Sequence, residues 1–163
     1  MRIILFVLLF CSANAVRTCP LTGCTYGDLG CNWVAKQLYC TSKSITGPLN
    51  ITDIPLDVEK IELNNNQITN ISVGMFDGLT ALTELKLYEN QLTTLPSGVF
   101  DGLTALESMD LNDNELTTLP SGLFDKPTEL VVLYLQDNQI KTVPHDIFSK
   151  LTKLSDSEIT GNP

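Results

Sequence analysis

Asparagine recurs every 24 residues along most of this chain, and this period constrains the fold more than any other feature. The asparagines of the series are Asn66, Asn90, Asn114, Asn138 and Asn162. A phenylalanine series keeps the same period, at Phe76, Phe100, Phe124 and Phe148. Self-similarity at a fixed period of about 20–50 residues is typical of a solenoid, in which each repeat is one unit that stacks on its neighbours.

The residue types within one unit predict a short strand followed by a return. In residues 84–88, two leucines alternate with polar or aromatic residues, and a period of two indicates a strand with one buried face. Asn90 follows where the chain turns, and its amide can bond backbone groups that the turn leaves unpaired. Stacked units then form one parallel sheet. We call the solvent-facing side of this sheet the sheet face.

The repeats resemble a known family. The pattern L-x-x-L-x-L-x-x-N-x-L is that of a leucine-rich repeat, and NQLTTLPSGVFDGLTAL, residues 90–106, closely resembles the repeats of the variable lymphocyte receptors of jawless vertebrates. More broadly it is similar to the extracellular repeats of Toll-like receptors, Slit and small proteoglycans. The resemblance covers residues 19–163. It implies an α/β leucine-rich-repeat solenoid, a right-handed horseshoe with a concave parallel sheet and an N-terminal disulfide cap.

The chain divides into three predicted segments. Residues 1–15 indicate a secretory signal peptide, with Arg2 before an apolar run and Ala13-Asn14-Ala15 as the cleavage site. The apolar run is shorter than the ~20 residues that span a bilayer. Residues 16–56 are predicted to form a cysteine-rich cap over the apolar end of the stack, and residues 57–163 the repeats, of which the last is incomplete. We expect a secreted, extracellular protein.

Four cysteines remain after the predicted signal peptide: Cys19, Cys24, Cys31 and Cys40. An even number in an exported chain predicts two disulfides, and four cysteines allow three pairings. The family resemblance implies Cys19 with Cys31 and Cys24 with Cys40. A zinc site is the alternative, but export and the lack of a C-x-x-C pair disfavour it.

Charge and composition exclude several functions. The net charge of −9 disfavours nucleic acid and anionic membranes as partners. His145 is the sole histidine, and the repeat register places no serine or cysteine nucleophile beside it, so we expect neither an enzyme nor a cofactor. Calcium could bind the column of Glu89, Asp113 and Asp137, although a solubilising role is the simpler interpretation. Asn50 and Asn70 begin N-glycosylation sequences.

The candidate ligand-binding residues lie at exposed strand positions, which vary between units while the structural columns repeat. Large amphipathic side chains supply most of the energy in protein recognition, so we expect Tyr88, Val132 and Tyr134 to be anchors. Polar specificity would come from Glu84, Lys86, Asp110, Asn112 and Gln136. The alternative is that these are ordinary solvated sheet residues.

We therefore predict a secreted recognition module that binds protein or glycan through the sheet face. The family resemblance implies immune recognition of antigens or pathogens. The alternative is a matrix-associated or inhibitory protein with one fixed protein partner. The end of the chain leaves an open strand edge at residues 154–160, which could pair two copies into a homodimer unless the chain is a fragment of a longer protein.

Overall fold

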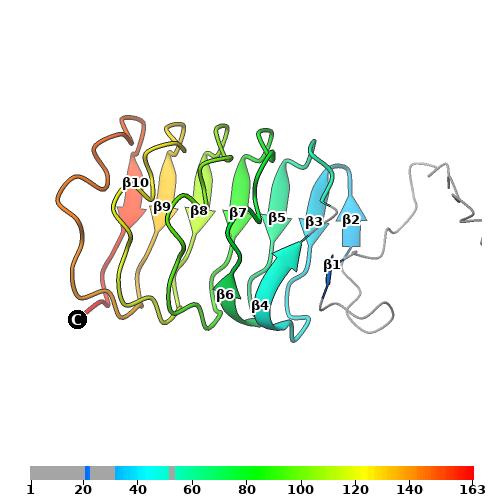
Figure 1. Cartoon of the computed structure of the whole chain (residues 1–163), viewed down its shortest axis with the longest axis horizontal. Coiled ribbons are helices and arrows are strands. Elements are labelled where there is room, and N and C mark those ends of the chain that lie inside the picture. The colour runs from blue at the N-terminus through cyan, green and yellow to red at the C-terminus, as the bar shows by residue number, and fades with distance from the viewer. Residues whose placement is uncertain (1–20, 23–31, 52–53) are drawn as a thin grey trace, which may run out of the picture.

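The computed structural model describes residues 21–22, 32–51 and 54–163 and arranges them as a stack of repeated turns (Figure 1). The strands of this part are β1 (Leu21–Thr22), β2 (Asn32–Val34), β3 (Gln37–Tyr39), β4 (Thr46–Ile51), β5 (Lys60–Glu62), β6 (Gln67–Ile71), β7 (Glu84–Lys86), β8 (Ser108–Asp110), β9 (Val132–Tyr134) and β10 (Asp156–Glu158). One sheet has the order β10-β9-β8-β7-β5-β3-β2 and a smaller one the order β1-β4-β6. In the large sheet only the β2–β3 pair is antiparallel. The predicted solenoid with a parallel sheet is confirmed.

The strands stack at an offset of 24 residues without slipping. Leu85 pairs with Met109, and Met109 pairs with Leu133. All three side chains are fully or almost fully buried. Because strand side chains alternate between faces, a slip of one residue would expose this whole column, so burial fixes the register. The same register places the residues on either side of each leucine on the sheet face.

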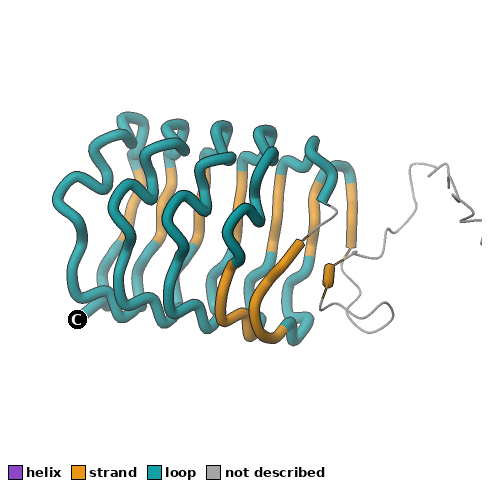
Figure 2. Tube along the Cα trace, in the orientation of Figure 1, coloured by secondary structure: helices purple, strands orange, loops and turns teal. Residues whose placement is uncertain are grey.

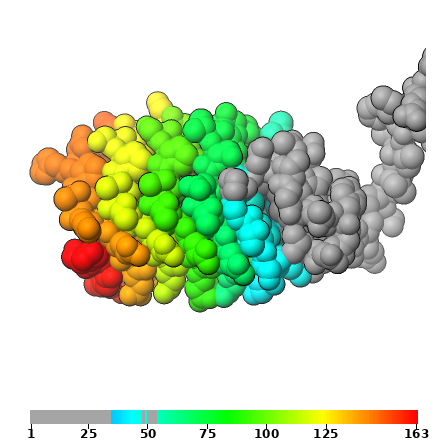
Figure 3. All heavy atoms as spheres, turned by 60° about the horizontal axis from the view of Figure 1, so that its bottom comes forward, coloured from blue at the N-terminus to red at the C-terminus, as the bar shows by residue number. Residues whose placement is uncertain are grey.

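A column of phenylalanines runs through the far side of the core. The ring centroids of Phe76 and Phe100 lie 6.1 Å apart, those of Phe100 and Phe124 6.4 Å, and those of Phe124 and Phe148 6.0 Å. The first three rings are fully buried and Phe148 is half-buried. Offset aromatic stacking at these separations stabilises each contact beyond the area it buries. Successive units therefore adjoin along the stack, as the space-filling view shows (Figure 3).

The repeated asparagine joins each unit to the one before it. The amide nitrogen of Asn114 donates to the carbonyl of Leu111 in its own unit at 3.1 Å and to that of Leu87 in the preceding unit at 3.0 Å. Its Oδ1 accepts from the backbone N–H of Leu92 at 3.1 Å. Asn90 and Asn138 make the equivalent contacts. These amides satisfy buried backbone groups at the turn, as the sequence predicts.

The returning segments consist of turns and extended chain, and no helix occurs among the described residues (Figure 2). Strands β4 and β6 pair in parallel on this side of the core. Gly102 lies so close to the preceding unit that a Cβ there would come within 2.9 Å of the Phe76 carbonyl oxygen. Pro127 is buried where Leu79 and Leu103 lie in the two units before it. The backbone N–H groups of these leucines donate to the carbonyls of the phenylalanines three residues earlier, and proline has no backbone N–H to make this bond.

The N-terminal end of the sheet extends further than the repeats. Gln37 of β3 pairs with Lys60, and Leu38 pairs with Ile61. Leu38 and Cys40 are buried, so this segment covers the first repeat. A cap over residues 16–56 was predicted from the sequence, but a strand within it in register with the repeats was not. The predicted signal peptide and Cys19, Cys24 and Cys31 lie outside the described residues, and the disulfide pairing stays a prediction.

At the other end, β10 pairs with β9 on one side only. Ser157 pairs with Leu133, as the repeat register predicts, but the whole of β10 is exposed. A polar residue is tolerated in this column because it is not buried between two units. Dimerisation through this edge stays a prediction.

Candidate recognition surface

The predicted binding residues lie in rows that run from strand to strand across the sheet face. Cross-strand pairing places Glu84, Ser108, Val132 and Asp156 in one row, and Lys86, Asp110, Tyr134 and Glu158 in the next. On β7 to β9 each of these side chains is half-buried, and on β10 they are exposed. Tyr88, Asn112 and Gln136 follow two residues beyond the second row and are also half-buried. The structure thus brings all eight candidates onto one continuous surface.

The row beyond these residues has a structural role. Asn65, Glu89, Asp113 and Asp137 have φ values of 57°, 52°, 52° and 54°. This left-handed conformation turns the chain away from the strand, and it suits asparagine and aspartate better than glutamate. Gly161 occupies the same place in the last unit, with φ of 71°. No group of three metal-ligating side chains occurs in the described residues, and these carboxylates do not form one.

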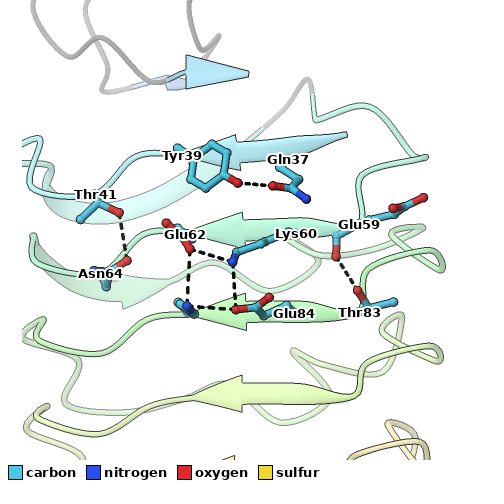
Figure 4. Close-up of polar contacts among 10 residues, drawn as sticks. Gln37, Tyr39, Thr41, Glu59, Lys60, Glu62, Asn64, Thr83 and Glu84 are labelled. Atoms are coloured by element: carbon cyan, nitrogen blue, oxygen red, sulfur yellow. Dashed lines mark hydrogen bonds and ion pairs between the residues drawn. The ribbon is translucent and has the colours of Figure 1, made fainter. Parts of the chain in front are cut away.

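At the N-terminal half of the sheet face, four alternating charges form a closed network (Figure 4). Lys60 Nζ lies 3.0 Å from Glu62 Oε1 and 3.1 Å from Glu84 Oε1. Lys86 Nζ lies 3.5 Å and 3.0 Å from the same two oxygens. Opposite charges on adjacent strands are thereby neutralised within the protein. Glu84 and Lys86 were predicted from the sequence to give polar specificity, and their ion pair with each other was not predicted.

The network shifts the pKa values of Lys60 and Glu84. Burial alone would lower the pKa of Lys60, but hydrogen bonds to Glu62 and Glu84 and their charges raise it above its ordinary value. Burial alone would raise the pKa of Glu84, but hydrogen bonds from Lys86 and Lys60 lower it. Both groups are therefore held in their charged forms.

The C-terminal half of the sheet face has a different electrostatic character. Asp110, Asp156 and Glu158 lie on β8 and β10, and no lysine or arginine occurs on β8, β9 or β10. Burial raises the pKa of Asp110, although Lys86 on the adjacent strand lowers it in part. Asp110 Oδ1 and Gln136 Oε1 are buried without a hydrogen-bond partner in the described part of the chain. This half is acidic and its polar groups are incompletely satisfied.

Tyr134 lies on β9, between the acidic residues of β8 and β10. Its hydroxyl donates to Asp156 Oδ2 at 2.6 Å, and this hydrogen bond raises the pKa of the tyrosine. Val132, two residues earlier on β9, is half-buried. Asn112 donates to Asp113 Oδ2 at 2.7 Å. An aromatic ring, an aliphatic side chain and several carboxylates therefore share one surface patch.

Other candidate features lie away from this surface. His145 is exposed on the returning side. In the part of the chain that the structure describes, no helix has the length and hydrophobicity needed to span a lipid bilayer.

Comparisons with known proteins agree with the architecture. The family model described as "Leucine rich repeat" matches residues 57–116 and 104–163. A crystal structure of a TLR13–ssRNA13 complex is similar, with 30% sequence identity and a TM-score of 0.70. The match covers 78% of this chain and 18% of that chain, so this chain spans a small part of that protein's length. No curated protein matches the chain significantly in sequence.

Proposed function

This chain belongs to the leucine-rich-repeat family, and we propose that it is an extracellular recognition module that binds a protein ligand through the sheet face. The observation that carries this proposal is the contrast between columns. Most buried positions repeat the same residue types from unit to unit, with Pro127 as an exception, whereas the side chains on the sheet face change from unit to unit. Residues that the fold does not require are available for binding. A protein-binding role is typical of the fold.

The charges of the sheet face indicate where a ligand binds and what it carries. The network around Glu84 neutralises the N-terminal half, while the carboxylates of Asp110, Asp156 and Glu158 have no cation on their own strands. Complementary charge steers association and selects partners. We therefore assign the contact to β8–β10 and the ligand to proteins that present lysine or arginine side chains.

Tyr134 and Val132 would be the anchors of this contact. Aromatic residues at the centre of an interface contribute more binding energy than surrounding polar contacts. Tyr134 also combines an apolar ring with a hydroxyl that already contacts Asp156, which limits its loss of conformational freedom on binding. Tyr88 lies nearer to the neutral network and would extend the contact toward the N-terminus.

The similar TLR13 structure contains single-stranded RNA. The sheet face of this chain is a poor match for such a ligand, because protein binding to nucleic acid depends on lysine and arginine that neutralise phosphates. The exposed strand positions of β8–β10 carry three acidic residues and no basic residue. We therefore propose that the ligand is a basic protein rather than a polyanion.

Secretion and an immune role form part of the same proposal and rest on the signal-like residues 1–15 and on the family resemblance. A matrix-associated or inhibitory protein with one fixed partner is the second candidate. Sequencing related transcripts from the source would separate the two candidates. Variation confined to the sheet face supports a diversified receptor, whereas invariant Tyr88 and Tyr134 support a fixed partner.

A displayed library of random peptides tests the proposed ligand class. The library is selected on the immobilised protein, and enriched clones are measured against Asp110→Asn/Tyr134→Ala and against Glu115→Gln. Glu115 is an exposed carboxylate on the returning side and serves as the control. We expect enriched clones to be rich in lysine and arginine, to bind more weakly in high salt, and to lose at least tenfold in affinity for the double variant only. Clones without excess basic residues, or with equal affinity for all three proteins, contradict the proposal.

A further inference from the structure

Asn70 departs from the repeat pattern at a place where the fold does not need an asparagine. It begins the sequence Asn70-Ile71-Ser72, which matches the acceptor sequence for N-linked glycosylation. The same place in the later units is occupied by threonine, at Thr94, Thr118 and Thr142. An asparagine here is thus specific to the first unit.

The local structure leaves the Asn70 side chain accessible. On strand β6, Ile68 and Ile71 are buried, Thr69 is half-buried and Asn70 is exposed. The amide nitrogen of Asn70 donates at 3.3 Å to the exposed hydroxyl of Thr69. The amide of Asn66, by contrast, is buried and bonds several backbone groups of two units. Modification of Asn70 would therefore break no hydrogen bond on which the stack depends.

The position of β6 determines where an attached glycan would lie. Strand β6 belongs to the small sheet on the returning side, whereas the candidate ligand-binding residues lie on the large sheet (Figures 1 and 2). Val73 follows Asn70 by three residues, a distance of at most about 11 Å along the chain, and its side chain is 77% exposed. The equivalent residues of the next two units are Ser97 and Ser121. A polar glycan on Asn70 would cover this exposed apolar side chain.

We propose that Asn70 is an N-glycosylation site whose glycan covers the returning side of the first unit and leaves the sheet face free. Nδ2 of Asn70 forms a bond to the anomeric carbon of the first sugar and loses one proton to solvent. The bond between that carbon and the diphosphate of a lipid-linked oligosaccharide donor breaks, and the diphosphate leaves. Ser72 supplies the hydroxyl that the acceptor sequence requires. The proposal requires export of the chain but is independent of the ligand.

Expression behind the host's own cleavable secretion signal in an animal cell tests the site directly. The secreted protein is analysed by intact mass and by peptide mapping, before and after treatment with peptide N-glycosidase. We expect the peptide that contains Asn70 to carry a glycan, and both Asn70→Gln and Ser72→Ala to abolish its modification. Ser72→Ala keeps the asparagine and removes only the acceptor sequence. Asn50→Gln is the matched control and should leave the Asn70 glycan in place.

Recovery of the Asn70 peptide without a glycan from the secreted, folded protein would overturn the proposal, whether or not Asn50 is modified. The second claim, that the sheet face remains free, is tested with the library-selected peptides. Their affinity should be unchanged after enzymatic removal of the glycan. A change greater than about twofold would overturn this claim, while failure to obtain any sheet-face binder refutes the proposed function and leaves the glycan assignment standing.

Discussion

Replacement of Asn114 by alanine tests the main source of cohesion between units. The amide of Asn114 contacts the carbonyls of Leu87 and Leu111 and the N–H of Leu92, and the residue is only 6% exposed. The two carbonyls each keep a second partner in the variant, because Asn90 also donates to Leu87 and Asn138 also donates to Leu111. The N–H of Leu92 loses its only hydrogen bond in the described structure.

The expected loss in the free energy of unfolding follows from these hydrogen bonds. An unsatisfied buried N–H costs about 1–3 kcal/mol, and each carbonyl that falls from two hydrogen bonds to one loses on the order of 0.5–1 kcal/mol. The free energy of unfolding should therefore decrease by about 3 kcal/mol. Asn162 makes the same type of contacts at the exposed end of the stack, where its hydrogen bonds to Ile140 and Leu135 are only partly buried. Because water can replace them, Asn162→Ala should cost about 1 kcal/mol.

Urea unfolding of the two variants and the parent, followed by circular dichroism, provides the measurement. The loss should appear as a lower transition midpoint, with a slope that changes little if the whole stack unfolds together. Equal losses at Asn114 and Asn162 would refute the reasoning, because the difference in burial would then have no effect. A loss below about 1 kcal/mol at Asn114 would show that relaxed backbone or water satisfies Leu92.

Three further predictions concern stability. Glu89→Asn should raise the free energy of unfolding by about 0.5 kcal/mol in urea titration, because asparagine tolerates the left-handed conformation better than glutamate; a decrease would refute it. Phe100→Ala should lower the free energy of unfolding by about 3–5 kcal/mol in calorimetry, and Phe148→Ala should lower it clearly less. The reason is that the ring of Phe100 is packed between two other rings, whereas the ring of Phe148 contacts one. The lowered pKa of Glu84 means that its carboxylate stabilises the fold at any pH above 4.5, its ordinary pKa. This contribution is lost as the pH falls through the lowered pKa. Acid titration of stability should therefore be shallower for Glu84→Gln, and parallel curves would contradict this.

Much of the fold could be predicted from the sequence because the repeat forces equivalent residues into equivalent environments. The 24-residue spacing of Leu85, Met109 and Leu133 predicts their pairing, and burial of one strand face then selects the register. The strand β3 was missed because residues 37–39 precede the first asparagine of the series and carry no repeat signal. Its place in the sheet is decided by pairing with β5.

The sequence alone determined which side chains of each unit are buried and which lie on the sheet face, because a period of two within a period of 24 leaves one arrangement that buries the leucines. Only the tertiary structure decided how the exposed residues interact. Lys60, Glu62, Glu84 and Lys86 neutralise one another across two strands, whereas Asp110 and Asp156 form no ion pair within the part of the chain that the structure describes. The 24-residue spacing places these residues on adjacent strands, but the strength of each interaction depends on the side-chain distances and the local burial, which the spacing does not give.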